Sequence, residues 1–274
     1  MNNPIVAALF PRTDIVHVTP VMAKEWLNRN THNRALRSSK VAEFARDIEA
    51  GNWAMNGETI KFDINGVLLD GQHRLSAIVK ADTSVDLLIV TGLDPATQHT
   101  MDAGAKRTTA DAFKLKDEKH TALLAAIVRR VWAWERGDHK LSMNLAPTIT
   151  EAQDFLNANP ALRRSAEIAS RVRNQFKYAP ASTTGVAHFL FNRISPDDTA
   201  WFFTRLADGA ELSAGHPILT LRKRLLSDSE GARKVSDHSQ LATLIRAWNA
   251  MRAGQKPTHF KPIATQDAPM PMPK

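Results

Sequence analysis

One stretch constrains the fold of this chain more than any other: residues 67–75, which read Val-Leu-Leu-Asp-Gly-Gln-His-Arg-Leu. The apolar run that ends at Leu69 predicts a buried strand, and Asp70-Gly71 ends that strand. Apolar residues resume at Leu75 with helical spacing, so a short helix is expected directly after the glycine. The stretch therefore predicts a strand, a glycine turn and a helix in immediate succession.

Such a junction favours the binding of an anion. Glycine lets the backbone approach a ligand closely, and the unpaired N–H groups of a helix start point toward that ligand, commonly a phosphate. Gln72, His73 and Arg74 lie in the first turn of the helix. His73 and Arg74 are donors for phosphate oxygens, so we expect a phosphate site here. The alternative is a solvated helix start without a ligand.

A hairpin is predicted before this junction, because Asn65-Gly66 separates two strand patterns. Antiparallel pairing brings the turn before the first strand level with the residues after the second. Glu58 is therefore expected beside Asp70, His73 and Arg74. Two carboxylates at a phosphate site suggest a Mg²⁺ ligand, with Glu58 as the candidate, or proton transfer by Glu58, Asp70 or His73. The alternative is that Glu58 only pairs with Arg74.

A second candidate anion site follows later in the chain. Lys106, Arg107 and Thr108 combine two cations and a hydroxyl at a predicted helix start. Thr108 or Thr109 is a suitable N-cap, and Asp111 suits the first turn. The alternative is a plain capped turn.

From about residue 118 onward the chain is predicted to be helical, and this part carries the excess of positive charge. Residues 1–118 hold 14 Lys and Arg against 15 Asp and Glu, whereas residues 119–274 hold 22 against 13. A basic helical domain favours DNA as the partner, because neutralisation of phosphates supplies most non-specific affinity. A merely solubilising basic surface is the alternative. The residues expected to contact DNA are Arg163, Arg164, Arg171, Arg173, Arg222, Lys223 and Arg224.

Composition excludes several classes of protein. The 274 residues include no cysteine, which excludes disulfides, thiolate metal sites and a cysteine nucleophile. No apolar run approaches the ~18 residues of a membrane span, so no membrane partner is expected. The apolar run of residues 5–10 is too short for a secretory signal. The absence of cysteine is what a cytoplasmic protein would show, and we expect that location. We expect domains at 1–117 and 118–253, and five prolines predict a disordered tail at 254–274.

The segment from about Ser38 to Val90 resembles the ParB/sulfiredoxin superfamily. It has a helix ending near Gly51, an Asn-Gly-Glu turn, a hairpin, a G-x-x-R box, a helix and a strand. Residues 70–74, Asp-Gly-Gln-His-Arg, are similar to the DGQHR variant of DNA-modification systems and phage ParB-like proteins. The resemblance spans roughly residues 10–115. It implies a small mixed sheet with helices for this part of the chain. The helical pattern from about residue 118 onward predicts an all-α domain after it, so the expected fold class is α+β.

In that superfamily the box binds nucleotide phosphates. The resemblance therefore implies that Gly71, Gln72, His73 and Arg74 bind a nucleoside triphosphate, ATP or CTP, together with Mg²⁺. The catalytic cysteine of the reductase members falls on Gln72, which excludes that activity here. One carboxylate of the G-E-R-R box of partitioning proteins is missing, which argues against clamp behaviour.

Three functional hypotheses follow. The first is a nucleotide-binding protein acting on DNA, with phosphoryl transfer, nucleotide hydrolysis or phosphodiester hydrolysis at residues 71–74. The second is a non-catalytic DNA-binding regulator or partitioning-type protein. The third is a phage or mobile-element protein whose first domain only assembles with partners, and a homodimer is left open. The expected location is the cytoplasm of a bacterium or of a phage-infected cell.

Overall fold

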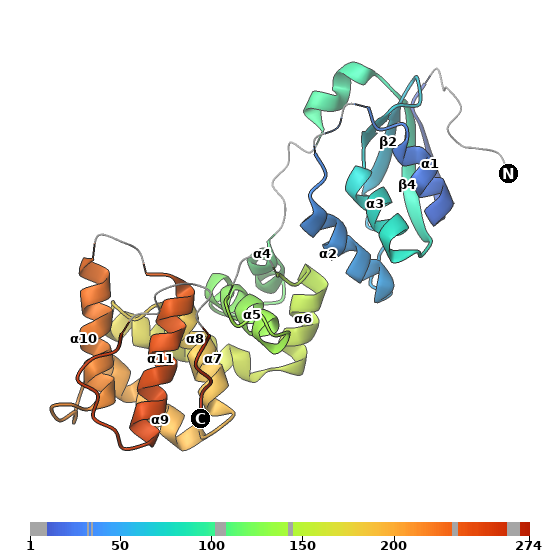
Figure 1. Cartoon of the computed structure of the whole chain (residues 1–274). Coiled ribbons are helices and arrows are strands. Elements are labelled where there is room, and N and C mark those ends of the chain that lie inside the picture. The colour runs from blue at the N-terminus through green and yellow to red at the C-terminus, as the bar shows by residue number, and fades with distance from the viewer. Residues whose placement is uncertain are drawn as a thin grey trace. The chain divides into compact units, whose positions relative to one another are not determined.

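The computed structural model describes residues 10–31, 33, 35–101, 108–141, 145–231, 235–261 and 269–274. The chain divides into two compact units, Met1–Lys106 and Arg107–Lys274 (Figure 1). The described part of the first unit combines a four-stranded sheet with helices, and that of the second unit consists of helices and connecting loops. The predicted α+β class is confirmed at this level.

The first unit is built on a mixed sheet in the strand order β1-β4-β2-β3. The parallel pair is β2 with β4, while β1 with β4 and β2 with β3 are antiparallel. The strands are β1 (Arg12–Val18), β2 (Thr59–Asp63), β3 (Leu68–Asp70) and β4 (Val85–Leu93). The helices are α1 (Pro20–Leu27), α2 (Ser38–Glu49), α3 (Gln72–Ala81) and the 3-10 helix η1 (Pro95–Thr100).

One face of this sheet carries the core of the first unit. Alternate residues of a strand point to the same face, and Ile60 and Phe62 of β2 are fully buried in one cluster with residues of α1, α2 and α3. Trp26 of α1 meets Phe62 edge to face, with ring centroids 5.5 Å apart. The three α-helices therefore cover the same face of the sheet, and α3 is fixed against β2.

The predicted hairpin is confirmed, with one irregularity that matters for the site. The Asp63 carboxylate accepts from the N–H groups of Asn65 (2.8 Å) and Val67 (2.7 Å), which stabilises the turn. Phe62 lies opposite Leu68, but Lys61 lies opposite Asp70 rather than Leu69, because β3 contains a bulge. The bulge places the Asp70 carboxylate beside the Lys61 ammonium.

The second unit is helical throughout its described length. Its core includes Phe191 and Trp248, whose rings stack with centroids 4.4 Å apart, and Phe202, which meets both rings. Its helices are α4 (Thr109–Lys114), α5 (Thr121–Glu135), α6 (Ile149–Ala158), α7 (Ala161–Gln175), α8 (Ala181–Asn192), α9 (Pro196–Asp208), α10 (Pro217–Glu230) and α11 (Asp237–Arg252).

The division between the units lies earlier than the predicted boundary at residue 117. Phe113 of α4 is 1% exposed and belongs to the core of the helical unit. The helix that carries it therefore belongs with the second unit, which starts at Arg107.

The prediction of a disordered tail at 254–274 does not hold for the described residues of that segment. Phe260 is buried in the helical core, and the Thr220 hydroxyl donates to the Pro257 carbonyl (3.0 Å). Residues 269–274 are hydrogen-bonded to α11, alongside which they run in Figure 1. Proline restricts the backbone to an extended form, so a proline-rich segment can dock as a preformed strand where matching donors exist.

No helix in the described ranges is long and apolar enough to cross a lipid bilayer.

Candidate functional site

The turn between β3 and α3 is set by Gly71. Its φ of +106° lies in the left-handed region that favours glycine. A Cβ atom at this position would lie 2.4 Å from Cδ1 and 3.3 Å from Cα of Ile60 on β2. The close packing of α3 on β2 therefore requires this glycine, whether or not a ligand binds.

Arg74 joins three parts of the site. Its Nη1 donates to Glu58 Oε2 (2.9 Å), and its Nη2 donates to the Thr59 carbonyl (2.7 Å) and to Asp70 Oδ2 (3.2 Å). The Arg74 side chain is only 12% exposed, whereas that of Glu58 is 61% exposed. The hairpin argument correctly brings Glu58, Asp70 and Arg74 together. Their arrangement is that of the alternative, in which Glu58 pairs with Arg74.

Asp70 lies at the centre of this network. It accepts from Lys61 Nζ (3.0 Å) and from the Gly71 N–H (2.7 Å) as well as from Arg74. Burial by itself raises the pKa of Asp70, but the charges of Arg74 and Lys61 and these hydrogen bonds outweigh burial and hold the pKa below its ordinary value. Asp70 is therefore ionised at neutral pH and stabilises the turn.

His73 and Gln72 face different surroundings. His73 Nε2 accepts the Arg37 N–H (3.1 Å), which places the proton of a neutral imidazole on Nδ1. Gln72 is 5% exposed, and its Oε1 accepts from Asn30 Nδ2 (2.9 Å). The Gln72 side chain therefore points into the unit, and its expected contact with phosphate stays a prediction.

A network of amide side chains, which the sequence argument missed, holds the turn from behind. Asn33 Nδ2 donates to Asn30 Oδ1 and to the Leu68 carbonyl, both at 2.7 Å. Gln98 Nε2 donates to Asn33 Oδ1 and to the Leu69 carbonyl, both at 3.1 Å. The network joins the loop after α1 and the helix η1 to β3. No spacing rule connects residues so far apart in sequence, and Lys61 was missed because the bulge was not predicted.

Charge is balanced in this cluster, with Lys61 and Arg74 against Glu58 and Asp70. Glu58 is the most exposed member of the cluster, with 61% of its side chain accessible. Within the described ranges, no three acidic or histidine side chains lie close enough together to hold a metal ion. Glu58 is therefore placed as a partner of Arg74, and the Mg²⁺ role expected of it stays a prediction.

The second candidate anion site is only partly visible. Lys106 and Arg107 lie outside the described residues. Thr108 is the N-cap of α4 and forms a capping box with Asp111, in which the Thr108 N–H donates to Asp111 Oδ2 (2.8 Å). The Thr108 hydroxyl also donates to that carboxylate (2.7 Å), as the capped-turn alternative predicts.

Several of the arginines expected to contact DNA have structural partners. On α7, Arg163 forms a two-pronged ion pair with Glu118, with nitrogen–oxygen distances of 2.6 and 2.9 Å. Arg164 pairs with Glu167 (2.7 Å), and Arg173 donates to the Ala179 carbonyl (3.0 Å). Arg171 is exposed, and the structure gives it no hydrogen bond or ion pair within the described chain.

The three expected DNA contacts on α10 also differ in whether they have a partner within the described chain. Arg222 donates to the carbonyls of Leu206 and Ala207 at the end of α9, and its guanidinium lies 4.1 Å from the centre of the Phe176 ring. Arg224 pairs with Asp228 (2.7 Å). Lys223 is exposed and, like Arg171, has no hydrogen bond or ion pair within the described ranges. Arg171 and Lys223 are thus the expected DNA contacts that remain available.

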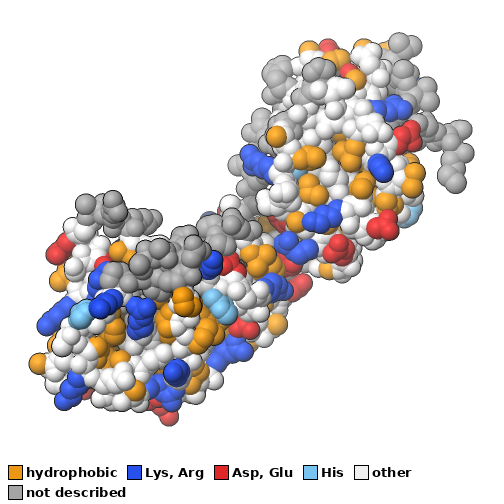
Figure 2. All heavy atoms as spheres, in the orientation of Figure 1, with side chains coloured by type: hydrophobic (Ala, Val, Ile, Leu, Met, Phe, Trp, Pro, Cys, Tyr) orange, Lys and Arg blue, Asp and Glu red, His pale blue; other side chains and the backbone are white. Residues whose placement is uncertain are grey.

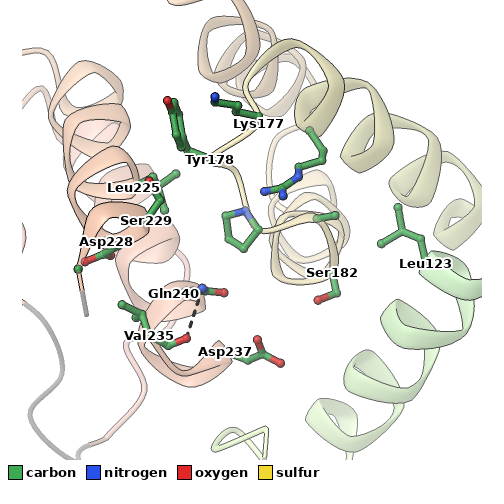
Figure 3. Close-up of a pocket in the computed structure, with 14 residues that line it drawn as sticks. Leu123, Lys177, Tyr178, Ser182, Leu225, Asp228, Ser229, Val235, Asp237 and Gln240 are labelled. Atoms are coloured by element: carbon green, nitrogen blue, oxygen red, sulfur yellow. Dashed lines mark hydrogen bonds between the residues drawn. The ribbon is translucent and has the colours of Figure 1, made fainter. Parts of the chain in front are cut away.

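A groove of about 940 Å³ lies where the end of α7 approaches α10. Figure 3 shows Leu225, Ser229 and Asp228 along the α10 side, with Lys177 and Tyr178 at one end. Of the residues expected to contact DNA, Arg173 lines it. Figure 2 shows Lys and Arg spread over the visible face of the helical unit and separated by apolar and neutral side chains. The positive charge of this face is therefore distributed over its surface.

Comparison with known proteins supplies no relative. No family model matches the chain, and neither a curated protein nor a solved structure matches it. The resemblance to the ParB/sulfiredoxin superfamily thus depends on the motif and element order of residues 38–90 and stays a prediction.

Proposed function

We propose that this chain is a DNA-associated protein whose first unit binds the phosphates of a nucleotide at the start of α3. The observation that carries the proposal is the Arg74 guanidinium, which is held at the glycine turn with its outermost contact made to an exposed carboxylate. Guanidinium binds carboxylate and phosphate by the same two-pronged geometry. A nucleotide phosphate can therefore take the place of Glu58.

The residues that fit a phosphate group here are Arg74, Lys61 and His73. Arg74 and Lys61 supply positive charge from α3 and β2, and His73 lies in the first turn of α3. Mg²⁺ commonly accompanies nucleoside triphosphates and keeps much of its own water, so it enters as part of an ATP or CTP complex. The chain itself then contributes charge and hydrogen bonds.

The geometry favours binding over turnover. A general base works best with a pKa near the operating pH, whereas the pKa of Asp70 is below its ordinary value and three donors engage its carboxylate. Glu58 is engaged by Arg74. Nucleotide binding without turnover is therefore preferred, and phosphoryl transfer or hydrolysis requires that a carboxylate first be released from these cations.

The helical unit supports the DNA part of the proposal through its charge. Residues 107–274 hold 25 Lys and Arg against 16 Asp and Glu. Arg171 and Lys223 are exposed and are the leading candidates for phosphate contacts. A distributed charge of this kind fits sequence-independent contact with the DNA backbone.

Calorimetric titration with ATP, CTP and GTP in the presence of Mg²⁺ tests the nucleotide site. Wild type is expected to bind at least one nucleotide, Arg74→Ala to lose binding, and Arg74→Lys to bind more weakly because it lacks the guanidinium fork. Circular dichroism must show that each variant is folded. Unchanged affinity in a folded Arg74→Ala protein would overturn the assignment of the site.

A further inference from the structure

The segment 269–274, Pro-Met-Pro-Met-Pro-Lys, is bound to α11 by a specific set of main-chain contacts. Asn249 Nδ2 donates to the Met272 carbonyl (2.9 Å), and the Lys274 N–H donates to Asn249 Oδ1 (2.9 Å). One side-chain amide thus bonds the main chain on both sides of Pro273.

An amide side chain that bonds the main chain in this way recognises an extended strand. The carbonyl of one residue and the N–H of the residue two places later lie on the same edge of an extended chain, so a single amide can bond both. Pro273 lies between them and has no N–H that would be left unsatisfied. Its ring also restricts φ to the extended region, which lowers the entropy lost on docking. A proline-containing segment is therefore well suited to this position.

The last main-chain oxygen of the segment is bound by two further donors. The Lys274 oxygen accepts from Trp248 Nε1 (2.9 Å) and from Arg252 Nη1 (2.6 Å). The Trp248 ring is buried in the helical core against Phe191, and Arg252 is held by Asp198 of α9 (3.0 Å). The donors are thus positioned by the helical unit itself.

We propose that Trp248, Asn249 and Arg252 form a binding site for an extended proline-containing peptide, and that residues 269–274 are its resident occupant. The preceding segment is anchored at Lys261, whose carbonyl accepts from Arg246 (2.6 Å). A connection of only seven residues, 262–268, then holds 269–274 at a high local concentration, on the order of millimolar for short linkers. The site is therefore closed by the chain's own segment, and a partner with a similar segment must displace it.

Fluorescence anisotropy with a labelled peptide of residues 266–274 tests this directly. A variant that ends at Lys261 retains Phe260 and is expected to bind the peptide, whereas the full chain is expected to bind it at least tenfold more weakly. Asn249→Ala in the shortened chain is expected to abolish binding. Thr204→Ala, an exposed change on α9, is the matched control and is expected to have no effect. Peptides with a free and an amidated carboxyl end are compared, because the Lys274 oxygen accepts two of the bonds.

The proposal is overturned if the folded, shortened chain binds the peptide no better than a scrambled one, or if Asn249→Ala leaves binding intact. Equal affinity for the full and shortened chains would show that 269–274 is not the occupant. A second measurement covers the case in which the shortened chain does not fold. In the full chain, Asn249→Ala should move the methyl NMR signals of Met270 and Met272 to unstructured values, and Thr204→Ala should not. Unmoved signals would contradict the proposal.

Discussion

At the scale of single residues, one buried histidine makes the stability of the helical unit depend on pH. His188 lies on α8 with its Nδ1 2.9 Å from the Ser165 hydroxyl. Burial, followed by the charges of Arg164 and Arg171, lowers the pKa of His188 from 6.5 to about 4. As the pH falls from about 6.5 toward 4, His188 binds a proton in the unfolded state but stays neutral in the folded state. Stability is therefore lost over that window.

The expected loss from His188 between pH 7 and pH 4.5 is about 2 to 3 kcal/mol. Urea unfolding of wild type and of His188→Gln at both pH values measures it. The difference in unfolding free energy between the two pH values should shrink in the variant by about that amount. An equal pH dependence in both proteins would show that His188 is not the group responsible.

A comparison of alanine variants at Gly71 and Gly57 separates two costs of an added methyl group, the steric clash and the backbone strain. Both have positive φ, at +106° and +84°, but a Cβ on Gly57 would have no heavy atom within 4 Å. Gly71→Ala is therefore expected to destabilise the first unit by about 1–3 kcal/mol more than Gly57→Ala. Thermal unfolding of both variants checks this, and equal losses would contradict the packing account of the turn.

At the scale of elements, Arg222 links the end of α9 to α10. Its guanidinium satisfies the carbonyls of Leu206 and Ala207, which have no partner within the helix. Arg222→Ala is expected to cost about 1–3 kcal/mol of stability in the helical unit, and Lys223→Ala next to it close to none. Chemical denaturation measures the unfolding free energy of both variants. Each variant removes one positive charge, so the comparison isolates the effect of the hydrogen bonds. Similar losses would contradict the capping role.

Elements and their short-range geometry were the predictable part of this structure. The Asn65-Gly66 turn fixes a hairpin within a few residues, and the meeting of Glu58, Asp70 and Arg74 follows from it. The bulge that places Lys61 on Asp70 depends on packing in three dimensions, and so does the contact of Gln98 with Asn33. Such long-range contacts leave no periodic signal in one sequence.

The tail shows a different limit of sequence reasoning. Its composition, rich in proline, is typical of disordered segments. The docking of 269–274 depends on the donors of Trp248, Asn249 and Arg252, which the fold collects on one surface. Composition describes a segment by itself and carries no information about a surface that can bind it.

At the scale of the whole molecule, the excess of positive charge belongs to the helical unit, and its use should appear in the salt dependence of DNA binding. The logarithm of the DNA affinity should fall linearly with the logarithm of salt concentration. Arg171→Glu and Lys223→Glu should each reduce the slope by about 1. Lys80→Glu, an exposed change of the same charge in the first unit, is the control. Equal effects of all three would indicate attraction to net charge alone.

The central claim is that a nucleotide phosphate replaces Glu58 on Arg74, and the most direct measurement is nucleotide affinity in Glu58→Gln. Removal of the competing charge should tighten binding by about two- to fivefold, the range expected for an exposed ion pair. Asp86→Asn, which removes another exposed carboxylate that pairs with His17, should leave affinity unchanged. Weaker binding in Glu58→Gln would mean that Glu58 supports the ligand, and the account of displacement would be wrong.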